Sequence, residues 1–363
     1  MDHSSRIRLL QFALLKNKLD LLLVTHLPNV RYLCGFTGSA GALLVRDRGV
    51  TFFTDGRYIA QARAEVCGAR VVIARKAPFL AAAESLTGSR IGRAGKQVLG
   101  VEGESMPAAM RDRIAALLRP RFKLRSAPPL VERARMVKDA EEIGCIRRAV
   151  EMGAGLFPIL RKKIRPGTRE VEVAAAMEYA ARRAGAEGMS FSTIIAAGKR
   201  SAVVHGRASE AAIPSRGFVV CDFGVILAGY CSDRTRTVHV GRPSAEVRGM
   251  YEAVLEAQQA AIAAVRPGVT AGEVDGGARR VLRKWKLARY FTHSTGHGLG
   301  LEIHEAPRLA AAQTQRLEPG MVITIEPGAY IPGKWGVRIE DVVVVTSSGC
   351  EVLAPRDKEL IVL

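Results

Sequence analysis

Four acidic residues in the second half of the chain lie within apolar, strand-like segments: Asp222, Asp233, Glu326 and Glu340. A buried carboxylate is costly unless a positive charge compensates it. Each of these acids, taken singly, is best explained by an ordinary ion pair, because such pairs also place acids in apolar settings. All four in matched segments, together with a histidine motif, favour a shared cationic partner instead.

The histidine motif covers Thr292–Gly300, contains His293 and His297, and is closely followed by His304. A neutral imidazole is a good ligand for zinc, cobalt, manganese or iron. The glycines on both sides of His297 allow the backbone to approach other groups closely. We therefore interpret His297 as a metal ligand.

One imidazole and four carboxylates are too many ligands for a single tetrahedral zinc ion. They suit two divalent cations bridged by carboxylates and about 3.5–4 Å apart. Four negative charges against two dications give rough neutrality, which removes the cost of burial. The oxygen-rich set favours Mn²⁺, with Co²⁺ or Zn²⁺ as alternatives. The predicted dinuclear site, which would activate water for hydrolysis, consists of Asp222, Asp233, His297, Glu326 and Glu340.

An internal duplication predicts how these residues come together. Arg165-Pro166-Gly167 and Arg266-Pro267-Gly268 each separate two long helical patterns. Each layout continues into a strand that carries an acid, Asp222 in the first copy and Glu326 in the second. A glycine-containing turn follows each strand and predicts a hairpin whose returning strand carries the second acid.

Short strands and helices alternate in the first third of the chain, where Ala42–Val45 and Val50–Thr54 are typical of a hairpin. Ser126-Ala127-Pro128-Pro129 is the best boundary signal, because consecutive prolines continue neither a helix nor a central strand. We predict an α/β (α+β) protein with an N-terminal domain over residues 1–127. Residues 128–363 would form a second domain with an internal pseudo-twofold repeat.

The composition excludes several classes of function. The chain has 363 residues and a net charge of +19, but its basic residues are scattered, so we expect no nucleic-acid partner. The N-terminal segment lacks the features of a signal peptide, and no apolar run approaches the ~20 residues of a membrane span. The six cysteines form no CxxC pair. We expect a cytoplasmic protein with free thiols and no membrane association.

The ligand segments resemble those of metallopeptidases with the pita-bread fold, which include methionine aminopeptidase, prolidase and Xaa-Pro aminopeptidase. The matching segments are Cys221-Asp222-Phe223-Gly224, residues 232–237, Thr295-Gly296-His297-Gly298, Ile325-Glu326-Pro327-Gly328 and residues 337–341. Residues 29–41 and 55–58 resemble the N-terminal domain of the Xaa-Pro aminopeptidase and creatinase branch. Methionine aminopeptidases lack that domain, and creatinase lacks the metal ligands. The resemblance covers the whole chain.

The resemblance implies roles for the matching residues. Asp233 and Glu340 match the bridging ligands, and Glu326 matches a ligand that also acts as general base. Three further residues match histidines that contact the substrate or the tetrahedral intermediate, and these are His205, His293 and His304. Val204 stands where the family usually has a proline before His205.

Two further matches concern the surroundings of the site. Arg338 matches an arginine that steadies Glu340 and belongs to the substrate-binding region, and Thr235 matches a hydroxyl that orients a ligand. Arg57 and Tyr58 are candidates for contacts with a neighbouring subunit's site. The resemblance implies short peptides as substrates and a homodimer or higher homo-oligomer.

The resemblance also implies an activity. It favours an Xaa-Pro aminopeptidase, which removes the first residue from peptides that have proline in second position. The alternative is a prolidase, which cuts Xaa-Pro dipeptides with the same fold and metals. A non-catalytic binding module of the same fold and a metal-free amidinohydrolase of the creatinase kind are disfavoured, because such proteins lack ligands that are all present here.

Overall fold

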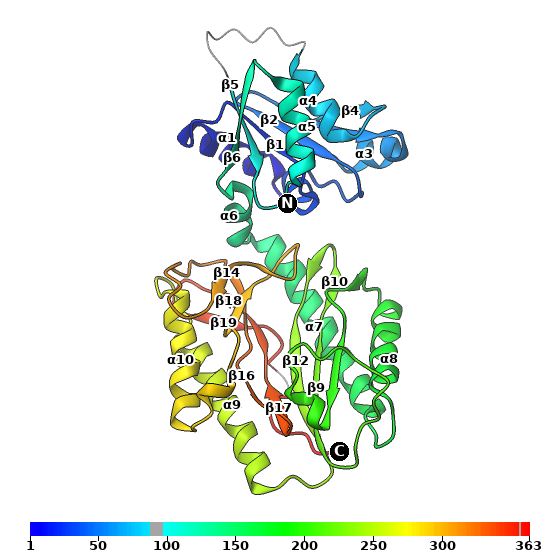
Figure 1. Ribbon diagram of the computed structural model, residues 1–363, viewed down its shortest axis with the longest axis vertical. Coiled ribbons are helices and arrows are strands. Elements are labelled where there is room, and N and C mark those ends of the chain that lie inside the picture. Colours follow the sequence, from blue (N-terminus) through cyan, green and yellow to red (C-terminus); the bar gives the residue numbers. More distant parts are fainter. Residues whose placement is uncertain (88–96, 356) are drawn as a thin grey trace. The chain divides into compact units, whose positions relative to one another are not determined.

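The computed structural model describes residues 1–87, 97–355 and 357–363. It divides into two compact units, Met1–Arg135 and Met136–Leu363 (Figure 1). The elements of the N-terminal unit are α1 (His3–Lys16), β1 (Leu21–Val24), α2 (Leu27–Cys34), β2 (Ala42–Arg46), β3 (Val50–Asp55), η1 (Gly56–Tyr58), α3 (Ile59–Glu65), β4 (Arg70–Ala74), α4 (Pro78–Thr87), β5 (Gln97–Glu102), α5 (Ala108–Leu118), β6 (Phe122–Ala127) and α6 (Leu130–Met136).

The strands of the N-terminal unit form one sheet in the order β4-β3-β2-β1-β5-β6. The predicted hairpin is present, because β2 pairs antiparallel with β3. Strands β5 and β6 extend the sheet in parallel beside β1. Apolar residues of the strands pack with α4 and α5 in a core that includes Leu23, Phe53, Val101 and Ile114.

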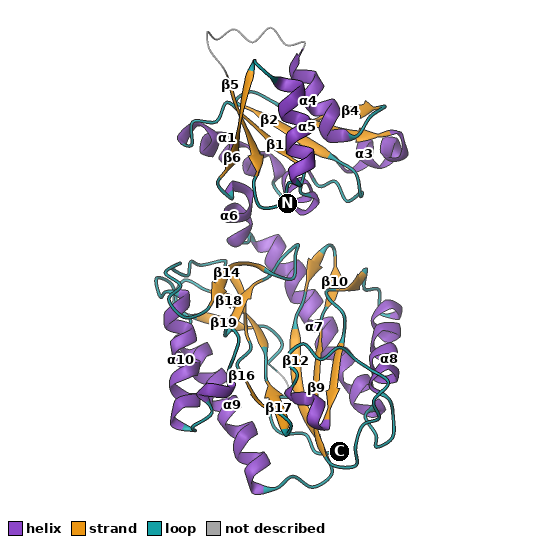
Figure 2. Ribbon diagram, viewed as in Figure 1, coloured by secondary structure: helices purple, strands orange, loops and turns teal. Residues whose placement is uncertain are grey.

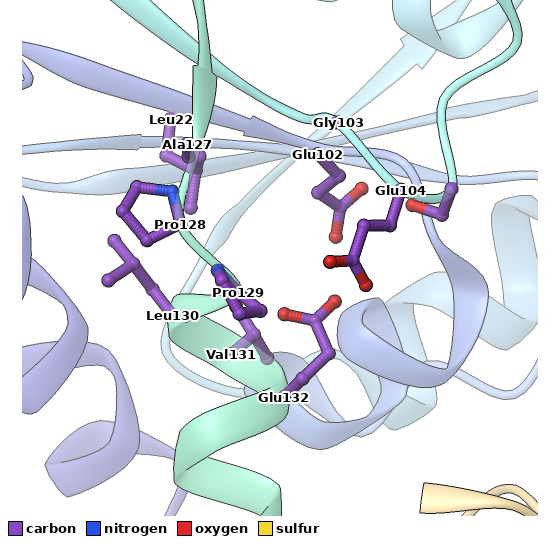
Figure 3. A pocket seen from close by; sticks show the side chains of 11 residues that line it. Leu22, Glu102, Gly103, Glu104, Ala127, Pro128, Pro129, Leu130, Val131 and Glu132 are labelled. Carbon is purple, nitrogen blue, oxygen red and sulfur yellow. The ribbon is translucent and has the colours of Figure 1, made fainter. Parts of the chain in front are cut away.

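The division between the units lies eight residues after the predicted one at Ala127, because α6 is tied to the N-terminal unit. Asn29 is the centre of that attachment. Its side-chain nitrogen donates to Glu132 at 2.6 Å and to Glu102 at 2.8 Å, and its oxygen accepts from Arg135 at 2.7 Å. Figure 3 shows Glu102 and Glu132 turned toward each other. The prolines therefore mark a turn into a helix and do not mark the boundary itself.

The C-terminal unit consists of paired helices around several small sheets (Figure 2). Its elements are α7 (Ala140–Lys163), α8 (Glu170–Arg183), β7 (Gly188–Met189), β8 (Ile194–Ala197), η2 (Gly198–Ala202), β9 (Gly217–Phe223), β10 (Val225–Leu227), β11 (Tyr230–Cys231), β12 (Arg234–Val240), α9 (Ala245–Ala264), α10 (Ala271–Lys284), η3 (Ala288–Tyr290), β13 (Gly296–Gly298), β14 (Glu305–Leu309), β15 (Val322–Ile325), β16 (Gly328–Ile331), β17 (Trp335–Arg338), β18 (Asp341–Val345) and β19 (Cys350–Val352).

Two hydrophobic cores divide this unit into halves. Helices α7 and α8 pack on strands β8, β9 and β12, and helices α9 and α10 pack on strands β15 to β18 (Figure 1). The sheet of the first half has the order β12-β9-β8, and that of the second has the order β14-β13-β15-β18-β19. Each half thus covers its strands with a helix pair, as the predicted duplication requires.

The two Arg-Pro-Gly turns repeat the same hydrogen bonds. Gly167 donates its amide to the carbonyl of Ile213 at 2.9 Å, and Gly268 donates to Leu317 at 2.8 Å. Both glycines have positive φ angles, +86° and +83°, which other residues adopt with strain. This identical backbone pattern supports an internal duplication more strongly than the triplets alone do.

A buried ionic network joins the halves behind the acidic strands. Asp341 accepts hydrogen bonds from Arg236 at 2.7 Å, Gln258 at 2.8 Å and Lys358 at 2.6 Å. Arg236 also donates to the backbone carbonyls of Thr235 and Glu340. The network therefore holds the strand of one half against that of the other.

All six cysteines carry free thiols, as predicted. Within residues 1–87, 97–355 and 357–363, every helix is too short or too polar to cross a bilayer.

We predict that Asp341→Ala lowers the free energy of unfolding of the C-terminal unit by about 3–5 kcal/mol, because Arg236 would remain as an uncompensated buried cation. The chain's two tryptophans, Trp285 and Trp335, both lie in this unit. Their fluorescence during urea unfolding therefore measures its stability separately.

The control for this prediction is Glu351→Ala, which breaks an exposed ion pair with Arg147 in the same unit. It should change the free energy of unfolding by less than about 1 kcal/mol. Equal effects of the two substitutions would show that the Asp341 network does not stabilise the unit.

Candidate metal centre

The strand pairings of both halves bring the four predicted acids into one cleft of about 740 Å³. In the first half, Asp222 lies near the end of β9, and Asp233 directly precedes β12, which pairs antiparallel with β9. In the second half, Glu326 directly follows β15, and Glu340 lies between β17 and β18. Each hairpin thus contributes two acids to the cleft, as the duplication predicted.

His297 joins these acids from β13. Its Nδ1 lies 3.0 Å from the carbonyl oxygen of Gly298, so Nδ1 carries the proton and Nε2 presents a lone pair. Nε2 lies 3.7 Å from a carboxylate oxygen of Asp233 and 3.5 Å from one of Glu326. Burial lowers the pKa of His297 to about 4. The Nε2 atom of His297 and the carboxylate oxygens of Asp233 and Glu326 are therefore all hydrogen-bond acceptors, and they face one another.

Gly296 shows why the histidine motif needs glycine. A Cβ atom at this position would lie 1.9 Å from the carbonyl oxygen of Thr324. The side-chain hydroxyl of Thr324 also accepts a hydrogen bond from the amide of His297 at 3.0 Å. Close contact with β15 therefore fixes the backbone on which His297 is carried.

The carboxylates in the cleft lie close enough together to repel one another, and this repulsion is reflected in their pKa values. Burial, reinforced by the charge of Glu340, raises the pKa values of Asp233 and Glu326 well above their usual range. Burial and the charge of Asp222 raise the pKa of Glu340 to about 8. Asp222 Oδ1 and Glu340 Oε1 are buried without a hydrogen-bond partner among the described residues.

These observations fit divalent cations. Ligand atoms of Asp233, His297 and Glu340 all lie within 4.8 Å of one another. The unpartnered oxygens of Asp222 and Glu340 add donors at the same place. Carboxylate oxygens with one imidazole suit hard or borderline dications such as Mn²⁺, Co²⁺ or Zn²⁺. Bound cations would supply the charge that this cluster of acids lacks.

The structure places Arg338 differently from what the resemblance implied. Its guanidinium is buried and donates directly to Asp222, not to Glu340. It reaches Glu340 only through Thr235, whose hydroxyl accepts from Arg338 at 3.1 Å and donates to Glu340 at 2.7 Å. The expected role of Thr235 is therefore consistent with the geometry. Arg338 thus connects two of the predicted ligands, Asp222 and Glu340, which come from different halves.

Two of the three predicted substrate histidines have well-defined surroundings in the cleft. His293 lies 2.8 Å from the carbonyl of Ser294 and 3.0 Å from the hydroxyl of Tyr330, and burial lowers its pKa to about 3. The ring of His304 lies edge-on to that of His297, with centroids 4.5 Å apart.

His205 lines the same cleft from an exposed position after η2. The carbonyl of the preceding Val204 accepts from Arg338 at 3.0 Å. The valine that stands in place of the family's proline is therefore compatible with a fixed backbone at this point.

Arg57 belongs to the N-terminal unit, where it pairs with Asp55 at 2.8 Å. The neighbouring Tyr58 bonds to Ser39 through its hydroxyl at 2.6 Å. The predicted contact of Arg57 and Tyr58 with a neighbouring subunit stays a prediction.

Tyr330 is a site residue that the sequence reasoning missed. Its hydroxyl accepts from Arg338 at 2.7 Å and lies 3.0 Å from His293, so it links Arg338, which contacts Asp222, to one of the predicted substrate histidines. Its position on β16 inside the second predicted hairpin was the available signal. Asp275 was missed as well, and it accepts from the amide and hydroxyl of Thr295 just before the glycine-histidine motif.

Comparisons with known proteins agree with this geometry. Residues 144–347 match the model of metallopeptidase family M24, and residues 6–137 match that of the creatinase/prolidase N-terminal domain. An Xaa-Pro dipeptidase of Pyrococcus horikoshii is 36% identical over 347 residues, which cover 95% of both chains.

Two solved structures extend the comparison. The Xaa-Pro dipeptidase from Bacillus anthracis has a TM-score of 0.94 at 39% identity, with both chains covered completely. An X-Pro aminopeptidase from Thermotoga maritima has a TM-score of 0.87 at 35% identity, with 95% of this chain and 98% of that chain covered. These likenesses confirm the predicted pita-bread fold with a creatinase-like N-terminal domain. The chain belongs to metallopeptidase family M24.

Proposed function

We propose that this protein is an Xaa-Pro dipeptidase, which hydrolyses the bond before proline in dipeptides. The observation that carries the proposal is the convergence of four acids and His297 in one cleft. The relatives named as Xaa-Pro dipeptidases, which match over nearly the whole chain, support the substrate. The comparisons thus favour the alternative over the Xaa-Pro aminopeptidase preferred from sequence.

The Xaa-Pro aminopeptidase remains a second candidate, because the Thermotoga maritima structure of that name is 35% identical. Two arginines that line the cleft, Arg207 and Arg308, favour the dipeptidase. A guanidinium is well suited to binding a carboxylate. A dipeptide presents its terminal carboxylate directly beside the scissile bond, where a longer peptide has a neutral amide.

The five ligands would hold two divalent cations per chain, preferably Mn²⁺, with Co²⁺ or Zn²⁺ as alternatives. These ligands would be Asp222, Asp233, His297, Glu326 and Glu340. When bound, such cations lower the pKa of water and stabilise negative charge that develops on a carbonyl oxygen.

Glu326 is the proposed general base. Its carboxylate would take a proton from water and pass it to the leaving amine. His293 is neutral in this environment, and with His205 and His304 it would contact the peptide. Arg338 would keep Asp222 and, through Thr235, Glu340 oriented.

A peptide panel tests the substrate class. With Mn²⁺ present, we expect cleavage of Leu-Pro at a kcat/KM at least about tenfold above that for Leu-Pro-Gly, because only the dipeptide can offer its carboxylate to an arginine, and a hydrogen bond between charged groups is worth about 1.5–3 kcal/mol. Leu-Ala serves as the control for the proline requirement. Faster cleavage of Leu-Pro-Gly than of Leu-Pro would favour the aminopeptidase.

Glu326→Gln tests the general base. The substitution keeps the shape of the side chain but removes its capacity to accept a proton, so kcat should fall by roughly 10²- to 10⁴-fold. Glu318→Gln is the matched control, because Glu318 is exposed and lies outside the cleft. A kcat within twofold of wild type for Glu326→Gln would rule out this role.

Metal binding should stabilise the C-terminal unit, because cations relieve the repulsion among its buried acids. With free Mn²⁺ at about 100 times its dissociation constant, the free energy of unfolding should rise by about 2.7 kcal/mol for each ion bound, measured by tryptophan fluorescence during urea unfolding. Elemental analysis should find two ions per chain. Asp233→Asn should reduce both quantities, and an Mn²⁺ response equal to that of wild type would contradict the assignment.

A further inference from the structure

A buried ion pair stands beside the cleft and has no part in the proposed chemistry. Lys138 Nζ lies 3.1 Å from Glu305 Oε2, and the two side chains are 1% and 7% exposed. Lys138 precedes helix α7, whereas Glu305 directly follows His304 at the start of β14. Burying two charges is expensive, so the pair calls for a structural or functional reason.

The loop that carries His304 is folded around the Glu305 carboxylate. Oε1 of Glu305 accepts from the amide of Glu302 at 3.1 Å, and the amide of Gly300 donates to the carbonyl of Glu302 at 3.0 Å. A Cβ atom at Gly300 would lie 2.8 Å from both carboxylate oxygens. Glycine therefore leaves the space that the carboxylate fills, and the carboxylate sets the path of residues 299–304.

The backbone of Lys138, the cation of the pair, is fixed by its contacts with Gly320. The amide of Lys138 donates to the carbonyl of Gly320 at 2.9 Å. Gly320 has a φ of +90°, and a Cβ atom there would lie 2.8 Å from the carbonyl oxygen of Lys138. The neighbouring Val137 forms an isolated antiparallel β-bridge with Met321. Lys138 is thus a rigid point to which the loop is attached.

The position of the His304 imidazole depends on this loop more than the position of the His297 imidazole does. The imidazole of His297 is held by the carbonyl of Gly298, and its amide by Thr324. The imidazole of His304 makes no hydrogen bond to any described residue and touches the ring of His297 only by its edge. Its place in the cleft therefore follows from the backbone that Glu305 and Lys138 hold.

We propose that Lys138 and Glu305 are positioning residues that set the imidazole of His304 against the peptide, an inference that rests on the proposed peptidase function. The pair leaves the metal ligands in place, because His297 has its own contacts. Its loss should reduce turnover through His304 alone.

A double-mutant cycle tests this dependence. Lys138→Met should lower kcat/KM on Leu-Pro by about tenfold or more, the usual effect of losing a group that orients a functional side chain. Lys138→Arg should restore most of the loss. In a His304→Ala background, Lys138→Met should change kcat/KM by less than about twofold. Multiplicative effects would overturn the proposal.

The control is Lys284→Met, which breaks an exposed lysine–glutamate pair with Glu256 and should leave kcat/KM unchanged. If Lys138→Met does not fold, Glu305→Gln replaces it in the cycle, since it removes the same ion pair and keeps the side-chain shape. The same coupling to His304→Ala is then expected, and its absence overturns the proposal.

A spectroscopic measurement keeps the inference separate from the peptidase function. In Zn²⁺-loaded protein labelled with ¹⁵N-histidine, Lys138→Met should shift or broaden the imidazole signals of His304, identified by their loss in His304→Ala, and should shift those of the neighbouring His297 ring much less. Unchanged His304 signals overturn the inference, whether or not peptides are cut. Shifted His304 signals in an enzyme that cuts no peptide would uphold the positioning and reject the proposed function.

Discussion

Repulsion among buried carboxylates is the constraint on which the C-terminal unit depends. Asp222, Asp233, Glu326 and Glu340 face one cleft, where burial and mutual repulsion raise the pKa values of the last three. Such a cluster is tolerable only where strong positive charge compensates it. Arg338 supplies one charge inside the protein. Divalent cations would supply the rest, and the same cations would provide the reactivity of a peptidase.

The duplicated architecture explains how so many acids reach one place. Each half carries two of them at the ends of a hairpin, and the network around Asp341 and Arg236 holds the two hairpins together. A single hairpin supplies only two of these acids, as Asp222 and Asp233 show in the first half. Joining two hairpins brings the acids of both halves to one cleft.

Each half also anchors its active-site loop with a buried acid on its second helix. Glu170 on α8 accepts from the amides of Ala197 and Ser209, which flank the segment carrying His205. Asp275 on α10 accepts from Thr295, between His293 and His297. The Lys138–Glu305 pair adds a third anchor for the loop of His304. Carboxylates thus form the candidate metal site and also hold the segments that carry the histidines around it.

The sequence by itself determined the ligand types, the strand and helix pattern, the duplication and the resemblance to pita-bread metallopeptidases. These properties are local, because a residue's chemistry, its capping residues and its hydrophobic period depend on neighbours along the chain. Hence β1 lies where its apolar run predicts, and the five ligands come from segments recognisable one at a time.

The tertiary structure alone decided which groups meet across the fold. Arg338 contacts Asp222, 116 residues away along the chain, and Lys138 contacts Glu305, 167 residues away. The attachment of α6 to Asn29, which shifts the domain boundary, is also a long-range contact. No local pattern specifies such pairs, because a guanidinium or ammonium group can satisfy any carboxylate within reach. Only the packing of the strands and helices determines which carboxylate lies within reach.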